Sequence, residues 1–412
     1  MATPSSAGGD ILIIGGGIFG AAVAHDLARH GLGERVLLLE RLQPAAGATS
    51  RAAALVTQVR DKPDQIALAR QTLRTIAELE TVYGEDIGRR TVGALHVAPA
   101  SHLHVLQARA DLAAAHGITF AWLSPAEALA RAPWLAPTAF DHALFFPDDC
   151  YVEPYLLATA LLRIACTLGV RTERADVTRI HVDGQRVRGV ELADGRRLAA
   201  STVVNAAGAW ANLLSTPLGL PLPMAPVRSQ YWITAPSPLF PKNGAIVLMP
   251  AVRAYARPEV GALLFGLRER QQKVADPRTL PADLSGFVFD PNDADGWANL
   301  AEGSDELTPY FPALTTLGMA HYLTGPSNYT PDGQLVAGAA PGISGLFVAS
   351  GCNGSGISFA GGVGRLLGEL IRGSATFVDP LPCAPGRHGD FDPYAPDFLA
   401  ACAAARAQKT SG

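Results

Sequence analysis

Residues 10–40 read DILIIGGGIFGAAVAHDLARHGLGERVLLLE, and this stretch decides the fold. The apolar run Ile11–Ile14 predicts a buried parallel strand, and residues 18–30 predict the helix that follows it. Residues 36–39 then supply a second apolar strand. Strand, glycine turn, helix and strand in this order predict a βαβ unit.

Three glycines in the turn, Gly15, Gly17 and Gly20, have the spacing of a dinucleotide-binding motif in its proper place between strand and helix. The first permits the tight turn, the second lets a pyrophosphate approach the backbone, and the third allows close packing. Phosphates bind at such a helix N-terminus because its N–H groups are free. Glu40 ends the second strand, where a carboxylate binds the ribose hydroxyls. A nucleotide site is therefore predicted, with NAD and FAD both open.

The bulk composition is that of a globular protein with more than one domain. The chain has 412 residues, of which 48% are hydrophobic and 17% charged, and one ordinary domain has roughly 150. Its net charge of −4 and the lack of a basic block give no case for nucleic acid. No apolar run approaches the ~20 residues of a membrane helix, and residues 1–10 do not resemble a signal peptide. We expect a cytoplasmic enzyme that acts on a small molecule.

Cysteine and histidine spacing indicates neither disulfides nor a metal site. The five cysteines are odd in number and include no C-x-x-C pair, so we expect reduced thiols. His102 and His104 have no matching cysteine or carboxylate partners for a metal ion. We also find no G-x-S-x-G elbow and no Walker loop.

Outside the first motif, helices and strands are predicted from periodicity and from capping signals. Helices are predicted at 61–82, 103–116, from the capping box at 124–127, at 154–168 and after Ser358. Strands are predicted within 170–198 and within 226–268, where β-branched and aromatic residues alternate. Beyond Asp379, prolines and then an alanine run indicate a tail.

A second strand, glycine turn and helix occur at residues 345–357, GLFVASGCNGSGI. The N-terminus of that helix would stabilise the negative charge that develops at N1 and O2 of a flavin on reduction. A nicotinamide cofactor has no such need. The second motif therefore favours FAD over NAD.

Five ordered segments resemble the D-amino-acid oxidase family of FAD-dependent oxidoreductases. They are residues 10–20 with Glu40, ATSRAA at 48–53, NAAGAW at 205–210, TPDG at 330–333, and 351–357. The resemblance implies a fold of α/β plus α+β class, with a Rossmann-like (βαβ) FAD-binding domain interleaved with an antiparallel-sheet substrate domain. We expect residues 1–60, 151–220 and 321–379 in the FAD-binding domain, 61–150 and 221–320 in the substrate or cap domain, and 380–412 as a C-terminal tail.

The resemblance also assigns cofactor contacts to the two glycine motifs, to segments along the flavin and to a segment that closes over it. They are Gly15, Gly17, Ile18, Phe19, Gly20, Glu40, Arg41, Thr49, Ser50, Arg51, Ala52, Val177, Ala206, Gly208, Trp210, Gly351, Asn353, Gly354, Ser355, Gly356 and Ile357. Relatives attach FAD covalently through a histidine where this chain has Arg51, or through a cysteine where it has Gly325. We therefore expect noncovalent FAD.

Within the family, AAALVTQVR at 52–60 and GPSNYTPDG at 325–333 are most similar to the dimethylglycine and sarcosine dehydrogenase branch, with glycine and sarcosine oxidases as near relatives. This implies oxidation of a secondary or tertiary amine of the N-alkyl amino acid type, by hydride transfer to flavin N5 and hydrolysis of the imine. Two alternatives remain open, a hydroxy-acid dehydrogenase on the same fold and a flavoprotein subunit of a heteromeric oxidase. The electron acceptor, oxygen or another carrier, is also open.

Five residues are the catalytic candidates. Tyr255 is similar to a substrate-contacting tyrosine of this branch, and Tyr329 lies in the 325–333 segment. Arg257 could hold a carboxylate bidentately or form a salt bridge. Arg51 would lie near the flavin, and Ser229 stands where the branch has an active-site histidine.

Two further positions depart from the relatives. Ser327 stands where glycine oxidase-like members have an arginine that binds the substrate carboxylate. Leu264 stands near the place of an oxygen-activating lysine in sarcosine oxidases. Substrate and acceptor are therefore less defined by the resemblance than the cofactor is.

Overall fold

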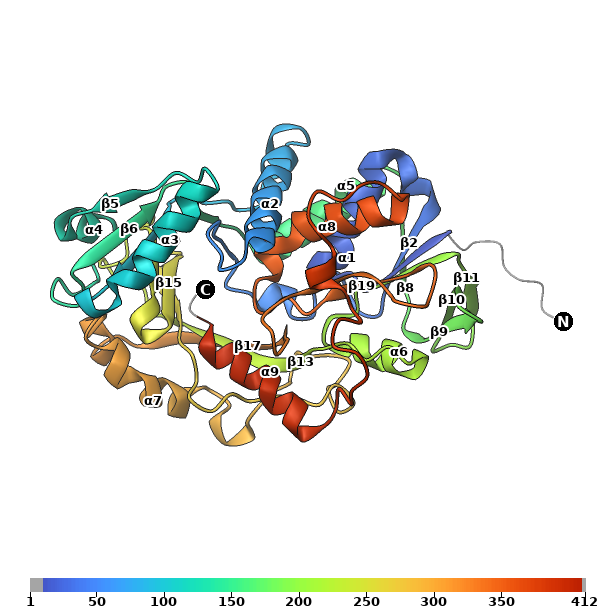
Figure 1. Cartoon of the computed structure of the whole chain (residues 1–412). Coiled ribbons are helices and arrows are strands. Elements are labelled where there is room, and N and C mark those ends of the chain that lie inside the picture. Colours follow the sequence, from blue (N-terminus) through green and yellow to red (C-terminus); the bar gives the residue numbers. More distant parts are fainter. Residues whose placement is uncertain (1–9, 410–412) are drawn as a thin grey trace.

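The computed structural model describes residues 10–409, which contain two large sheets with helices around them (Figure 1). One sheet has six strands in the order β18-β19-β12-β1-β2-β8, and the other has eight in the order β17-β13-β16-β15-β14-β4-β6-β5. The fold class predicted from the sequence is confirmed. The expectation that no signal peptide is present falls on residues 1–9, which lie outside the described range.

The six-stranded sheet is parallel except for its edge pair, β18 with β19. Its strands are β1 (Ile11–Ile14), β2 (Val36–Glu40), β8 (Arg171–Arg174), β12 (Thr202–Asn205), β18 (Val336–Ala339) and β19 (Leu346–Ser350). All four residues of β1 are buried, as expected of a central parallel strand with both faces covered. The predicted βαβ unit is confirmed.

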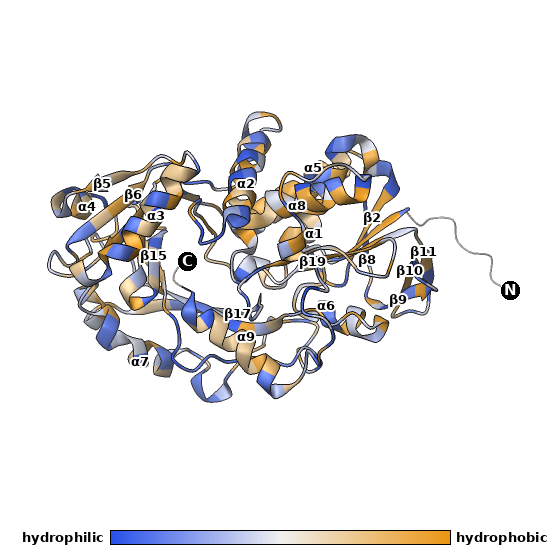
Figure 2. Ribbon diagram, viewed as in Figure 1, coloured by the Kyte–Doolittle hydropathy of each residue, from blue (hydrophilic) through white to orange (hydrophobic). Residues whose placement is uncertain are grey.

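Four helices pack around this sheet, and Figure 2 shows much of α1 and α8 as hydrophobic. They are α1 (Ile18–Leu27), α2 (Pro63–Thr81), α5 (Pro154–Thr167) and α8 (Gly356–Arg372). Helix α1 packs against α5 and α8, and α2 packs against α8. Two predicted bounds shift: α1 ends at Leu27 in a π-helical turn, and α8 begins at Gly356 rather than after Ser358.

Two small sheets flank the large one. Strands β9 (Val177–Asp183), β10 (Arg186–Leu192) and β11 (Arg197–Ala199) form an antiparallel sheet, and β3 (Leu55–Val56) pairs with β7 (Cys150–Tyr151). The strands predicted within residues 170–198 are confirmed. Short helix α6 (Ala211–Ser215) follows β12 in the chain.

The eight-stranded sheet is antiparallel except where β14 pairs with β4. Its strands are β4 (Ala94–Ala98), β5 (Ala121–Leu123), β6 (His142–Phe146), β13 (Ala225–Thr234), β14 (Ile246–Met249), β15 (Ala254–Glu259), β16 (Ala262–Gly266) and β17 (Met319–Tyr329). Helices α3 (Leu103–Ala115), α4 (Pro125–Arg131) and α7 (Trp297–Leu307) accompany it. The capping box of α4, Ser124 with Glu127, is formed as predicted.

Three expected domain assignments differ from the observed packing. Strand β17 pairs with β13 in the eight-stranded sheet, although the expected boundary at residue 321 places most of it with the FAD-binding domain. Helix α2 packs on α8, beside the six-stranded sheet, and not with the cap. The expected tail contains α9 (Pro396–Gln408), which packs against β13 and β17 (Figure 1). Periodicity shows that an element forms but not which sheet it joins.

Within residues 10–409, no helix has both the length and the apolar character of a membrane span. The same residues contain no group of three or more His, Cys, Asp or Glu side chains placed to hold a metal ion. All five cysteines are free thiols.

Candidate active site

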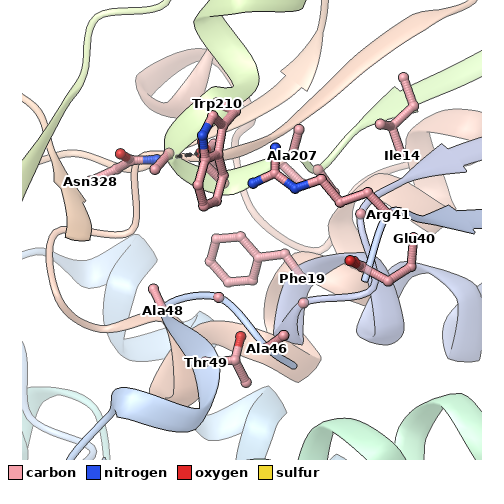
Figure 3. A pocket seen from close by; sticks show the side chains of 18 of the residues that line it. Ile14, Phe19, Glu40, Arg41, Ala46, Ala48, Thr49, Ala207, Trp210 and Asn328 are labelled. Atoms are coloured by element: carbon pink, nitrogen blue, oxygen red, sulfur yellow. Dashed lines mark hydrogen bonds between the residues drawn. The ribbon is translucent and has the colours of Figure 1, made fainter. Parts of the chain in front are cut away.

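A cavity of about 410 Å³ opens where β1 and β2 end and α1 begins. Open parallel sheets bind their ligands at this carboxyl edge. In Figure 3, Phe19, Glu40, Thr49 and Trp210 surround the open space. The predicted cofactor residues that line it are Gly15, Gly17, Ile18, Phe19, Glu40, Arg41, Thr49, Val177, Ala206, Gly208, Trp210, Gly351 and Gly356.

The first glycine motif leaves room for a ligand only because its glycines lack side chains. Gly15 has a φ of +102°, and a Cβ there would lie 2.5 Å from the carbonyl oxygen of Ala206. A Cβ on Gly20 would lie 1.9 Å from the carbonyl oxygen of Gly15. Gly20 therefore acts through packing and does not line the cavity. The N-terminal turn of α1, with Gly17 and Ile18, is left facing the cavity.

The carboxylate of Glu40 is fixed at the cavity wall by two backbone bonds. Its Oε2 accepts from the N–H of Gly16 at 2.7 Å, and its Oε1 accepts from the N–H of Leu42 at 2.9 Å. Each carboxylate oxygen retains a further lone pair. The group is thus oriented to accept hydrogen bonds from ribose hydroxyls.

Arg41 and Trp210 cover another side of the cavity (Figure 3). The guanidinium carbon of Arg41 lies 3.8 Å from the centroid of the Trp210 ring, which is a cation–π arrangement. The indole N–H of Trp210 donates to the carbonyl of Leu280 at 3.4 Å. These contacts hold two large side chains in place beside the ligand space.

A second cavity, of about 130 Å³, adjoins the first at the N-terminus of α8. Both cavities are lined by Ile18, Ala48, Thr49, Ser327, Cys352 and Gly356. Four catalytic candidates come together in the second one: Arg51, Ser229, Tyr255 and Tyr329. Predicted cofactor residues Arg51, Ala52, Gly354, Ser355 and Ile357 also line it.

Residues 10–370 match the family model described as DAO, FAD dependent oxidoreductase. The chain belongs to this FAD-dependent oxidoreductase family. Its cofactor is FAD, and the glycine turns and Glu40 fit that cofactor, as the choice of FAD over NAD predicted.

Within the DAO family, the chain is similar in sequence to two curated relatives and in fold to one solved structure. The chain is 30% identical to 4-methylaminobutanoate oxidase (formaldehyde-forming) of Paenarthrobacter nicotinovorans, over 87% of this chain and 43% of the relative. It is 30% identical to mitochondrial sarcosine dehydrogenase of Homo sapiens, over 89% of this chain and 40% of the relative. The chain thus spans less than half the length of these relatives. The structure of glycine oxidase from Geobacillus kaustophilus superposes with a TM-score of 0.76 at 28% identity, covering 92% of this chain and 99% of that one.

Three predicted FAD contacts, Gly20, Ser50 and Asn353, line neither cavity. Asn353 is turned into the protein, where its Oδ1 accepts from the N–H of Thr330 at 2.9 Å and its Nδ2 donates to the carbonyl of Gly351 at 3.0 Å. These bonds hold a residue whose φ is +50°. Asn353 therefore shapes the turn before α8, and its contact with FAD stays a prediction.

Arg257, the fifth catalytic candidate, is not among the residues that line the second cavity. It is buried, its Nε donates to the carbonyl of Ala53 at 2.8 Å, and its guanidinium pairs with Glu259. The ion pair with Glu259 corresponds to the salt bridge that the sequence analysis gave beside carboxylate binding as an interpretation of Arg257. The bond to Ala53 holds a segment that does line the cavity.

The two positions at which DAO relatives attach FAD lie side by side. A Cβ on Gly325 would lie 2.9 Å from Cδ of Arg51, so the arginine stem takes the space of a side chain at 325. The guanidinium of Arg51 donates to the carbonyls of Ala46 and Gly47 at 2.6 and 2.9 Å. Arg51 thereby holds the loop between the two cavities.

Three cationic side chains in the second cavity escaped the sequence analysis: Arg406, which is buried, and Arg268 and Lys409, which are half-buried. None belongs to a motif, and two come from the segment that the sequence predicts as a tail. Burial, together with Arg268, lowers the pKa of Lys409 well below its usual value, and burial raises the pKa of Tyr255. Among residues 10–409, no Asp or Glu lines this cavity.

Proposed function

We propose that this enzyme oxidises a secondary or tertiary amine that carries a carboxylate, an N-alkyl amino acid. One observation carries the proposal: the cavity beside the FAD cavity is lined by tyrosines and cationic side chains, without a carboxylate among the described residues. An ammonium group would find no opposite charge there, whereas a neutral amine with an anionic carboxylate fits.

The side chains of this cavity prepare the amine for hydride loss. Bound FAD supplies the acceptor for a hydride from the C–H bond next to nitrogen. Because burial raises the pKa of Tyr255 and Tyr231, both hydroxyls stay protonated and can form hydrogen bonds with the substrate. The surrounding positive charge favours the neutral amine, whose lone pair stabilises the forming iminium. Leu55 and Ile357 add apolar wall that excludes water.

The names of the relatives support the same substrate class. Both 4-methylaminobutanoate and sarcosine combine a methylamino group with a carboxylate, and each is named with an oxidase or dehydrogenase that resembles this chain. After hydride loss, water would add to the iminium carbon and split it into an amine and an aldehyde. N-demethylation of an amino acid is thus the reaction we propose.

The test is anaerobic reduction of the bound flavin by a panel of substrates. We expect sarcosine, dimethylglycine or 4-methylaminobutanoate to bleach the flavin, faster at higher pH where more of the amine is neutral, and lactate to leave it oxidised. Bleaching by hydroxy acids alone would overturn the proposal in favour of a hydroxy-acid dehydrogenase. Admission of air then shows whether oxygen reoxidises the flavin or another carrier is needed. Turnover by the purified chain without partner proteins would contradict the alternative that the chain is only the flavoprotein subunit of a heteromeric oxidase.

A pair of tyrosine variants tests the cavity itself. Tyr255→Phe removes a hydroxyl from the lining, and loss of a hydrogen bond of about 1.4 kcal/mol would slow flavin reduction roughly tenfold. Tyr155→Phe is the matched control, because that tyrosine is 51% exposed on α5. Both variants should bind FAD and be reduced by dithionite like the wild type.

A further inference from the structure

Helix α9 lies beyond the segment that the family model matches, residues 10–370, yet it supplies part of the substrate cavity. Arg406, in its last turn, and Lys409, directly after it, both line that cavity. We infer that this helix provides the anion-binding subsite, in which Arg406 together with Lys409 binds the carboxylate of the substrate. The inference rests on the proposed function for the identity of the substrate, but not for the presence of the subsite.

Arg406 has hydrogen-bonding capacity that the described residues leave unused. The side chain is 0% exposed, and its Nε donates to the carbonyl of Arg228. Its two terminal nitrogens have no hydrogen-bond partner among residues 10–409. Buried N–H groups without partners are costly, and a planar guanidinium fork matches the two oxygens of a carboxylate. A carboxylate in the cavity would satisfy both nitrogens.

Lys409 is also incompletely paired. Its Nζ donates to the carbonyl of Asn353 at 2.8 Å and to Oγ of Ser355 at 3.0 Å, which uses two of the three donors of an ammonium. Both acceptors are neutral. Ser355 is also the residue that precedes α8, so Lys409 lies where the helix dipole is positive. A nearby anion would stabilise the ammonium and the helix terminus together.

Among the described residues, the walls of the cavity carry cationic side chains and no acidic ones. Arg51, Arg268, Arg406 and Lys409 line it, and within residues 10–409 no Asp or Glu does. Glu269, a buried acid that follows β16 in the chain, is already paired with Arg228 at 2.8 Å. An anionic group of the ligand would therefore compensate the charges of Arg406 and Lys409.

The position at which glycine oxidase-like relatives were expected to place an arginine cannot perform this task. Ser327 lies in β17 opposite Val227, and its hydroxyl contacts Sγ of Cys352 at 3.6 Å. Helix α9 packs against the same two strands, β13 and β17, and its end lines the same cavity as Ser327. It is fixed there by Cys402, which is fully buried in a cluster with Val227 and Tyr329.

The experiment measures binding of a non-oxidisable carboxylate to the FAD-loaded enzyme. Methoxyacetate, an analogue of sarcosine with an ether oxygen in place of nitrogen, is titrated while the flavin absorption spectrum is recorded, and methoxyacetamide serves as the neutral probe. We expect Arg406→Met to raise the Kd of methoxyacetate more than tenfold and to leave that of methoxyacetamide within twofold. Arg406→Lys should recover part of the affinity.

Arg253→Met is the matched control, because this exposed arginine donates to the carbonyl of Ala407 in α9 but does not line the cavity. It should leave both Kd values unchanged. If Arg406→Met loses FAD, Lys409→Met provides the second measurement, with an expected rise of severalfold. Equal methoxyacetate affinity in wild type and in every variant that retains FAD overturns the inference.

Failure of the subsite and failure of the proposed function give different results. If no amine reduces the flavin but Arg406→Met still loses methoxyacetate, the reaction is wrong and the subsite stands. If sarcosine reduces wild type and Arg406→Met with the same Kd and the same limiting rate, the reaction stands and the subsite is wrong. A raised Kd with a nearly unchanged limiting rate identifies Arg406 as a binding residue.

Discussion

Replacing the carboxylate of Glu40 by an amide separates its structural role from its role in FAD binding. Its two oxygens each accept one backbone N–H, from Gly16 and Leu42. In Glu40→Gln, either orientation of the amide turns its NH₂ group toward one of these donors. One N–H thus loses its acceptor, which should lower the free energy of unfolding of the apoprotein by about 1–3 kcal/mol.

A second, separate loss appears on FAD binding. The ionised group that accepts the ribose hydroxyls is removed, and a charge-assisted hydrogen bond contributes about 1.5–3 kcal/mol, so the Kd of FAD should rise roughly 10- to 150-fold. Urea unfolding of the apoprotein measures the first quantity, and quenching of flavin fluorescence measures the second. Glu34→Gln is the control, since Glu34 is exposed and does not line the cavity. A Kd within threefold of wild type would refute the assignment of Glu40 to the ribose.

Three further outcomes are expected. Acid precipitation should release FAD into the supernatant, because neither Arg51 nor Gly325 can tether it; flavin in the pellet contradicts this. Arg228→Met leaves Glu269 charged and buried, so the free energy of unfolding should fall by about 3–5 kcal/mol in urea titrations, and a loss below about 1 kcal/mol is inconsistent with a buried pair. Burial alone would raise the pKa of Asp332, but the Arg387 guanidinium outweighs it and holds that pKa well below its usual range. Because the folded pKa is depressed, this stabilisation is present above about pH 4 and is lost as the pH falls, so Asp332→Asn should flatten the acid side of the stability profile.

The cofactor half of the molecule could be predicted because its information is local. Gly15, Gly17 and Glu40 lie within one βαβ unit. The closely spaced glycines indicate directly that the turn has no room for side chains. The long apolar strands and the helices around them were predicted for the same reason. The sheet that each strand joins was not predicted. Strand β17 joins the eight-stranded sheet by pairing with β13, about a hundred residues earlier in the chain, and no local pattern indicates this pairing.

The substrate half shows what pattern matching misses. Tyr255 was a candidate because it lies in a segment similar to relatives, whereas Arg257, two residues later in β15, is already bonded to the carbonyl of Ala53 and to Glu259. Side chains alternate across a strand, so residues two apart lie on the same face. Position in the strand therefore does not show that Arg257 is already bonded within the protein; only the packing does. Arg268, Arg406 and Lys409 carry no motif at all. Their place in the cavity depends on long-range packing, which no local pattern records.

Family membership therefore fixes the cofactor more firmly than the substrate. The residues that line the FAD cavity all lie within the matched segment 10–370, and the glycine turn before α1 has no room for side chains at Gly15 and Gly20. The charge of the substrate cavity, by contrast, comes partly from α9, outside that segment. A helix docked on β13 and β17 can change its inward residues without disturbing either glycine motif. If Arg406 in α9 and Lys409 directly after it bind the substrate carboxylate, as we infer, specificity for the anionic end of the substrate can vary independently of FAD binding. Enzymes with the same flavin site then need not share the same substrate.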